Sequence, residues 1–332
     1  MLRALKNLVL LLAVAMTSPL AAADPYSPRH RSVDMNVGEE VQVALPDGTQ
    51  ARVKLVGVEE QRDSVRHALR EARVSLEVNG AAATLVSGNY RLPQQVGGVQ
   101  IDCTATKGLN INADAWEDSW GIDKDARLRI WPAGSPWMPP NQLVYPIKQR
   151  WFASATQMSN EPSHVDGGDA PNGRPVYYHN ALDIGGAEGQ AEVVAATDGM
   201  VVSAANKRLP GVAHPPVETR PDVVYVRDAR NWYYRYSHLK TIDVQLGQSV
   251  KMGQPIGLLG KEGSAGGWSH LHFDIKAIQP SGRCGMMREI VTPCTSDVER
   301  RQTSEKCTGA HSSQSGVSRT HPARACALAK CA

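Results

Sequence analysis

The sequence lacks the paired cysteines from which structural zinc sites are usually built. None of its six cysteines has C-x-x-C spacing, and five of them lie in the last stretch, residues 281–332. An exported protein could pair these five in disulfides. Cys103 is isolated upstream, at an inward-facing strand position after Ile101, and is predicted to be a small buried hydrophobic side chain. No cysteine is therefore assigned a functional role.

Long apolar runs are also scarce. The only one covers residues 7–16, after Arg3 and Lys6 and before three consecutive alanines at 21–23. This is the layout of a secretory signal peptide, and the run is too short to span a bilayer; a buried N-terminal helix is the alternative. We expect residues 1–23 to be a signal peptide, with no transmembrane segment. No cysteine stands at the cleavage point, so no lipid anchor is expected there. The prediction is an exported protein, periplasmic or extracellular.

A basic surface for nucleic acid is missing as well. The formal net charge is +3, but the first 23 residues contribute +2 and residues 281–332 contribute +4, which leaves about −3 for residues 24–280. A nucleic-acid-binding domain would carry clustered positive charge. We therefore expect no nucleic-acid partner.

Short strands separated by turn signals dominate residues 24–132, which are predicted to form an N-terminal β-rich domain, a small sandwich or barrel. The turns Pro46–Thr49 and Asn79-Gly80 each separate two alternating apolar segments, and so predict two hairpins. Residues 62–73 are predicted to form a helix with a thin apolar face. The expected strands are 40–45, 51–58, 74–78, 82–86, 98–103 and 126–131.

Proline and glycine mark residues 133–145 as a linker, and a second domain is predicted over residues 146–280. Many short strands with glycine-rich turns and almost no helix indicate an antiparallel β scaffold. Residues 281–332 form a Cys-rich tail of uncertain order, which could be tied by disulfides, disordered, or the product of a slipped coding frame. The expected strands of the second domain are 192–196, 199–204, 223–226, 232–237, 255–259 and 270–275.

Three short segments contain candidate chemistry. His179 and Asp183 lie four residues apart beside Gly185, where a strand or turn is more consistent with the sequence than a helix. Taken alone, they are more simply a core histidine and a turn aspartate. Two imidazoles occur at a spacing of two in His270 and His272, which places both on the polar face of a strand.

The third segment ends a strand-like run at His238. Taken together, His179, Asp183 and His272 supply two imidazole nitrogens and one carboxylate oxygen, the donor set that catalytic zinc takes with a fourth position left for water. His238 and His270 remain for acid–base work. Asp274 shares the face of His272 and is predicted either to support that ring or to be solvent-exposed.

The segment 176–278 resembles the lysostaphin-type (LytM/LasA-like) zinc metallopeptidases. Five blocks carry the resemblance in order: the H-x-x-x-D motif of His179 and Asp183, VVAATDGMVV (193–202), YSHL (236–239), VKMGQPIGLLG (250–260) and HLHF (270–273). The sequence departs from the family pattern at Ala181, at Trp268-Ser269, and in the long stretch 206–222. These departures concern substrate preference more than activity.

The resemblance implies a mainly β fold, with an antiparallel β-sheet metallopeptidase domain preceded by the small β-rich domain. It also implies one Zn²⁺ per chain held by His179, Asp183 and His272, with His238 and His270 as catalytic histidines. The expected substrate is a peptide of bacterial peptidoglycan. Two alternatives stay open: a peptidase acting on extracellular glycine-rich protein, and a non-catalytic relative that binds the cell wall and activates an amidase.

Overall fold

The structure is a computed structural model of the 332-residue chain. It describes residues 29–64, 68–88, 91–111, 120–136, 141–149, 156–157, 181–212 and 217–287. The predicted signal peptide (1–23), His179 and most of the predicted tail lie outside these residues. In the described part, no helix is long and apolar enough to cross a membrane.

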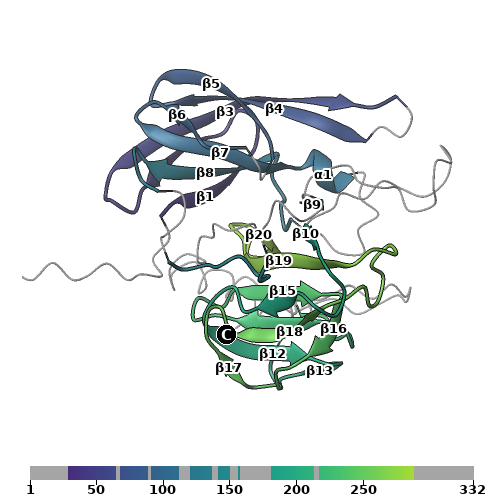
Figure 1. Ribbon diagram of the computed structural model, residues 1–332. Helices are drawn as coiled ribbons and strands as arrows, with labels where there is room; N and C mark the ends of the chain where they lie inside the picture. The colour runs from purple at the N-terminus through teal and green to yellow at the C-terminus, as the bar shows by residue number, and fades with distance from the viewer. Residues whose placement is uncertain are drawn as a thin grey trace, which may run out of the picture.

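The N-terminal part is a sandwich of two four-stranded antiparallel sheets, drawn as two layers in Figure 1. One sheet has the order β1-β8-β7-β6 and the other β2-β3-β4-β5. The core lies between them, where Leu55 of one sheet belongs to the same buried cluster as Ile101 and Leu128 of the other. The elements are β1 (Arg31–Met35), β2 (Glu40–Ala44), β3 (Gln50–Arg62), β4 (Leu69–Val78), β5 (Ala81–Val86), β6 (Gln94–Val96), β7 (Val99–Thr106), the one-turn helix α1 (Gly108–Ile111) and β8 (Ala126–Pro132).

Both predicted hairpins are present. β2 pairs with β3, and β4 pairs with β5 across Asn79-Gly80. Asn79 and Gly80 have φ values of 49° and 86°. Two consecutive positive φ values give the turn a twist that matches the flanking strands, and asparagine and glycine are the residues that adopt them most readily. The sequence prediction is confirmed because this turn chemistry is local.

The predicted helix over residues 62–73 is wrong. β3 continues to Arg62, and β4 begins at Leu69 directly opposite it. Ala72, within the expected helix, is instead buried in a cluster with Trp120 from a distant part of the chain. A thin apolar face stabilises a short helix little, so strand pairing and this tertiary contact override the local preference.

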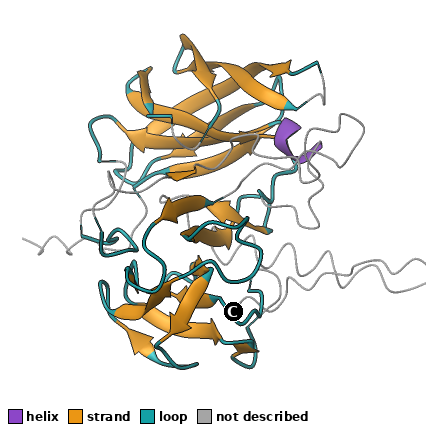
Figure 2. Ribbon diagram, turned by 45° about the vertical axis from the view of Figure 1, so that its right-hand side comes forward, coloured by secondary structure: helices purple, strands orange, loops and turns teal. Residues whose placement is uncertain are grey.

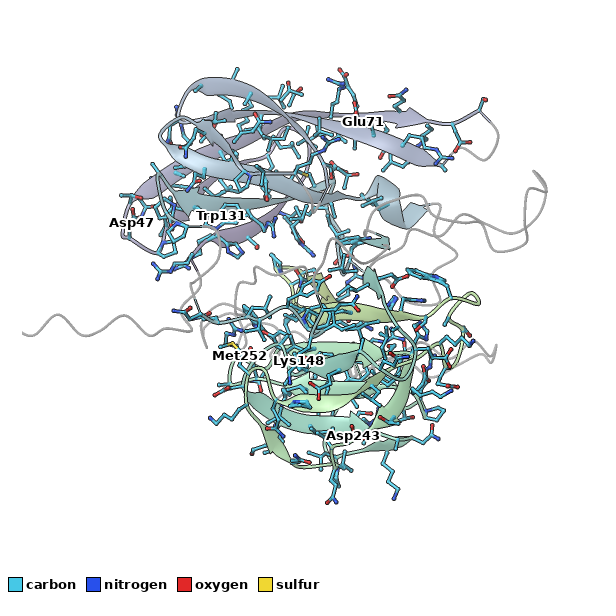
Figure 3. All side chains as sticks on the ribbon, viewed as in Figure 1. Asp47, Glu71, Trp131, Lys148, Asp243 and Met252 are labelled. Atoms are coloured by element: carbon cyan, nitrogen blue, oxygen red, sulfur yellow. The ribbon has the colours of Figure 1, made fainter. Side chains whose placement is uncertain are left out.

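Cys103 and His30 are among the buried side chains of this sandwich that carry polar atoms. Cys103 is fully buried in the core, as predicted, and burial raises the pKa of its thiol to about 12. Trp131, labelled in Figure 3, packs against the ring of His30 at a centroid distance of 4.9 Å. Neither nitrogen of the buried His30 ring has a hydrogen-bond partner among the described residues. Burial lowers the pKa of His30 well below its usual value, and the positive charge of Arg129 lowers this pKa further.

The C-terminal part pairs a nine-stranded antiparallel sheet with a three-stranded one (Figures 1 and 2). The large sheet has the order β13-β12-β14-β15-β19-β10-β9, with β17 beside β12 and β20 beside β19; the small sheet has the order β11-β18-β16. The strands are β9 (Thr156–Gln157), β10 (Leu182–Gly185), β11 (Glu192–Val194), β12 (Gly199–Ala204), β13 (Lys207–Arg208), β14 (Val224–Arg227), β15 (Tyr233–Ser237), β16 (Leu239–Ile242), β17 (Ser249–Val250), β18 (Pro255–Leu259), β19 (His270–Ile278) and β20 (Cys284–Met287).

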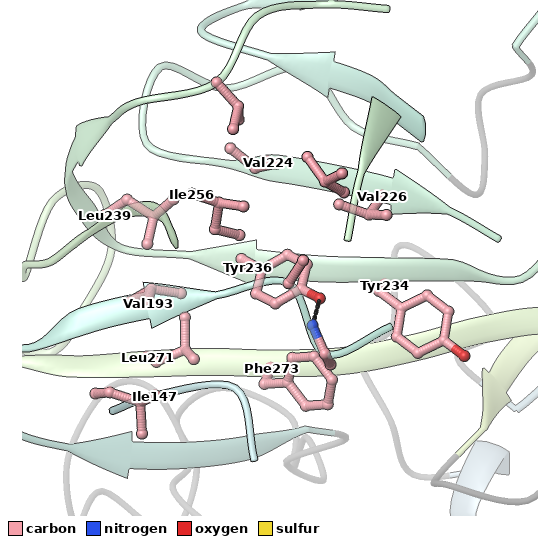
Figure 4. Close-up of a cluster of buried hydrophobic side chains, with 14 of the residues drawn as sticks. Ile147, Val193, Val224, Val226, Tyr234, Tyr236, Leu239, Ile256, Leu271 and Phe273 are labelled. Atoms are coloured by element: carbon pink, nitrogen blue, oxygen red, sulfur yellow. Dashed lines mark hydrogen bonds between the residues drawn. The ribbon is translucent and has the colours of Figure 1, made fainter. Parts of the chain in front are cut away.

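The larger hydrophobic cluster of this part lies on one face of the large sheet. This buried cluster joins the small sheet, through Val193, Leu239 and Ile256, to Leu271 and Phe273 of β19 (Figure 4). The opposite face of β19 is thereby left for polar side chains. The antiparallel, mainly β architecture predicted from the sequence is confirmed.

All strand pairings in the described part join strands on the same side of the predicted linker, residues 133–145. The large sheet extends into the predicted tail, because β20 pairs with β19. Arg283, just before β20, forms an ion pair with Asp123 of the N-terminal part at 2.6 Å. The two parts therefore touch, and the exact domain boundaries stay a prediction.

Candidate metal centre

Strand pairing brings the predicted aspartate ligand next to a predicted histidine ligand. Asp183 of β10 lies directly opposite His272 of β19 in antiparallel register. Its Oδ1 is 3.0 Å from Nδ1 of His272, and its Oδ2 is 3.3 Å from Nε2 of His270. The carboxylate side chain is only 7% exposed. One buried carboxylate thus contacts two of the predicted site histidines.

The two faces of β19 divide as the period of two predicts. Leu271 and Phe273 lie in the hydrophobic core, while His270 and His272 turn toward Asp183 on the opposite face. Successive side chains of a strand point to opposite faces, so the H-x-H spacing places both rings together. Burying polar rings is costly unless they are paired, and Asp183 provides that pairing.

His238 joins this group from the end of β15, where Ser237 lies opposite His272. Its ring centroid is 4.7 Å from that of His270 and 5.9 Å from that of His272. Nδ1 of His238 lies 2.7 Å from the carbonyl oxygen of Glu262. Four of the five predicted site residues are therefore assembled on one face of the sheet. The fifth, His179, is outside the described residues.

The protonation of the two histidines of β19 differs. Burial lowers the pKa of His270 to about 4, with a further decrease from the nearby His238, although Asp183 opposes the shift. Burial acts on His272 in the same direction, but the neighbouring carboxylates of Asp183 and Asp274 prevail and raise its pKa. His270 is consequently a neutral imidazole at neutral pH.

Trp268 contacts the ring of His270 through both its side chain and its main chain. Its indole stacks on the imidazole at a centroid distance of 4.1 Å, and its carbonyl oxygen lies 3.2 Å from Nδ1 of His270. The sequence marked Trp268 only as a departure from the family pattern. Its contact with His270 follows from the turn that precedes β19, which no periodicity reveals.

Asp274 is buried, so the prediction of solvent exposure is wrong and the supporting role is the one that its location favours. Its side chain is 1% exposed, and Oδ2 lies 3.7 Å from Nε2 of His272 and 3.6 Å from Nη1 of Arg235. Neither carboxylate oxygen makes a hydrogen bond to the described residues. Burial raises the pKa of Asp274, but the nearby Lys276 and His272 outweigh burial and lower this pKa below its usual value. The carboxylate is therefore charged. It faces the side of the His272 ring remote from Asp183.

The donor chemistry of the site fits zinc. Among the described residues, no group of three His, Cys, Asp or Glu side chains is arranged to hold a metal ion. Asp183 Oδ1 and His272 Nδ1 nevertheless lie 3.0 Å apart on facing strands. A carboxylate oxygen and an imidazole nitrogen are two of the three protein ligands typical of catalytic zinc, and a further histidine would complete the set. His179 stays the predicted third ligand.

Residues 177–282 match the model of Peptidase family M23. This segment is about a third of the chain and includes His179, Asp183, His238, His270 and His272. The lysostaphin-type resemblance predicted from the five sequence blocks is confirmed for this segment. The match supports peptidase activity in general.

Several solved structures of low sequence identity resemble this fold. The catalytic domain of lysostaphin from Staphylococcus simulans is 21% identical, with 38% of this chain and 81% of that chain covered and a TM-score of 0.29. A mutant catalytic domain of the prophage-encoded M23 protein EnpA from Enterococcus faecalis is 18% identical, with coverages of 45% and 95% and a TM-score of 0.29. A zinc-containing peptidase from Vibrio cholerae is 15% identical, with coverages of 66% and 81% and a TM-score of 0.30. No curated protein sequence matches the chain significantly.

Proposed function

We propose that this chain, whose residues 177–282 match Peptidase family M23, is an exported zinc metalloendopeptidase that hydrolyses peptide bonds of bacterial peptidoglycan. One observation carries the proposal. The Asp183 carboxylate lies between the rings of His270 and His272, with His238 beside them, on the polar face of one sheet. Metal ligands and proton carriers of this kind serve amide hydrolysis.

One Zn²⁺ would be held by His179, Asp183 and His272. When bound, zinc supplies Lewis-acid chemistry and lowers the pKa of a coordinated water to about 7. The rest falls to side chains of the chain itself. Asp183 carries the negative charge that favours a cation, and Asp274 faces the remote edge of the His272 ring and helps to keep it oriented.

Proton transfer is assigned to His238 and His270. His238 points Nδ1 at the Glu262 carbonyl, so Nε2 is the ring atom left to accept a proton from water and return it to the leaving amine. His270 is neutral at neutral pH and can accept a hydrogen bond. Which of the two acts as the general base is a question for mutant kinetics.

Incubation of purified protein with purified peptidoglycan, followed by mass spectrometry of the released fragments, tests the proposal. We expect new amino and carboxyl termini within the peptide part of the wall, and one zinc per chain by elemental analysis. His272→Ala should abolish both. His30→Phe serves as a matched control, because His30 is also buried but lies in the N-terminal sandwich.

If zinc-loaded protein releases no fragment, the proposed enzymatic activity is refuted, and the amidase-activating role is the alternative that is left. Cleavage of elastin-like glycine-rich protein without cleavage of the wall would overturn the substrate. Export is tested separately, by sequencing the N-terminus of the protein recovered outside the cytoplasm. A mature N-terminus at Asp24 is expected.

A further inference from the structure

A buried carboxylate lies behind His238, outside the predicted site residues. The side chain of Asp222 is 2% exposed. Its Oδ2 accepts a hydrogen bond from the main-chain N–H of His238 at 3.2 Å and lies 3.5 Å from the ring Nδ1 of the same residue. The main-chain carbonyl of Asp222 also accepts a hydrogen bond from Leu239 at 3.1 Å. Asp222 therefore contacts both the backbone and the ring of His238.

The position of this carboxylate is itself fixed. Arg220 donates from Nε to Oδ1 of Asp222 at 3.1 Å and from Nη2 to Oδ2 at 2.8 Å. Gly263 packs so closely on this pair that an added Cβ would lie 2.2 Å from Nη2 of Arg220. Burial would raise the pKa of Asp222, but the hydrogen bonds from His238 and the charge of Arg220 prevail and lower it. The carboxylate is therefore ionised at neutral pH.

The backbone of His238 needs such a support. Its φ is +68°, in the left-handed region that residues with a side chain seldom adopt because the conformation is strained. Strained residues persist where the surrounding structure over-determines them, and they cluster at functional sites. Here the Asp222 side chain holds the N–H of the strained residue, and the Glu262 carbonyl holds its ring.

We propose that Asp222 is a positioning residue for His238, which holds its strained backbone and keeps the Nδ1–H tautomer, so that Nε2 is presented beside His270. This inference rests on the proposed function for its kinetic consequence. The tautomer assignment follows because Nδ1 faces two acceptors, the Glu262 carbonyl and the Asp222 carboxylate, and can satisfy them only as a donor.

The chain contains a matched control at the other end of β14. The side chain of Asp228 is 1% exposed and accepts a hydrogen bond from the guanidinium of Arg230, two residues away. It also accepts hydrogen bonds from the main-chain N–H groups of Arg230 and Trp232. Asp222 and Asp228 therefore share burial, an arginine partner and backbone hydrogen bonds. Only Asp222 contacts a predicted catalytic histidine, so the difference between equivalent variants isolates positioning from structural support.

The kinetic experiment compares Asp222→Asn with Asp228→Asn in the full zinc-loaded chain, with peptidoglycan fragments as substrate. Both variants are expected to lower the melting temperature. Asp222→Asn should lower kcat at least about tenfold and leave KM within about twofold. Loss of a hydrogen-bonding partner that orients a functional histidine commonly lowers activity ten- to a hundredfold. Asp228→Asn should leave kcat within about twofold. Equal losses in the two variants would overturn the proposal.

A second readout does not need activity. Long-range ¹H–¹⁵N NMR correlations report which ring nitrogen of a histidine carries the proton, and the His238 signal is identified by its loss in His238→Gln. We expect the Nδ1–H pattern in the parent protein and in Asp228→Asn, and a mixture of tautomers in Asp222→Asn. An unchanged His238 signal in Asp222→Asn refutes the positioning role. A changed signal in a chain that cuts no peptidoglycan refutes the proposed function alone.

Discussion

Two buried tyrosines on adjacent strands, Tyr225 of β14 and Tyr236 of β15, differ in whether the phenolic oxygen has a partner. Both are 0% exposed. The Tyr236 oxygen accepts a hydrogen bond from the main-chain N–H of Ala196 at 2.7 Å, the dashed line in Figure 4. The Tyr225 oxygen has no hydrogen-bond partner in the described part of the chain. Removal of the hydroxyl should therefore have opposite consequences at the two positions.

The expected magnitudes follow from these contacts. Tyr236→Phe keeps the ring and its packing against Phe273 at 5.3 Å, but leaves the Ala196 N–H buried without an acceptor. An orphaned buried donor costs about 1–3 kcal/mol, so the free energy of unfolding should fall by that amount. Tyr225→Phe removes a buried hydroxyl that makes no hydrogen bond to the described residues. The free energy of unfolding should therefore rise by about 1 kcal/mol.

Urea denaturation of the full chain, followed by circular dichroism, measures both changes. In a thermal scan, each kcal/mol corresponds to roughly 2–4 °C for a domain of this size class. The parent protein and the double variant complete the set, since the two sites share no hydrogen bond. The reasoning fails if Tyr236→Phe is as stable as the parent, or if both single variants shift stability in the same direction.

Three further outcomes are expected. Asp183→Ala should reduce zinc affinity more than tenfold in a chelator competition, because a carboxylate ligand is removed; undiminished affinity would exclude Asp183 as a ligand. Burial lowers the pKa of His30 in the folded state, so this ring does not reduce stability above the pKa of an unfolded histidine, about 6.5, and stability is lost as the pH falls below it. His30→Phe should abolish this loss, and a retained pH dependence would contradict the assignment. Asp102→Ala should destabilise the chain by about 3–5 kcal/mol in urea denaturation, because the buried Arg129 loses a carboxylate partner at 2.9 Å. A much smaller loss of stability would contradict this reasoning.

Some features of this protein depend on neighbours in the sequence, and these were predictable. The Asn79-Gly80 turn sets the twist of its hairpin through two backbone angles. The spacing of His270 and His272 places both rings on one face of any strand that contains them. The signal peptide, the domain boundaries and the role of His179 as a ligand stay predictions.

Other features depend on which distant strands pair. The helix expected over residues 62–73 failed because Leu69 pairs with Arg62 and Ala72 is buried near Trp120. Local propensity is a weak preference, and tertiary burial outweighs it. A similar dependence conceals Asp274, whose burial follows from the packing of the sheet and not from its place in the motif.

The sequence by itself determined which residue types could bind a metal and move protons, because alternation along a strand and short motifs are local. The tertiary structure alone decided that Asp183 lies 3.0 Å from His272, since that distance follows from the register of β10 on β19. It also decided that Asp222 supports His238 from 16 residues away in the chain. Neither contact has a sequence period, because each depends on the return of the chain to the same sheet.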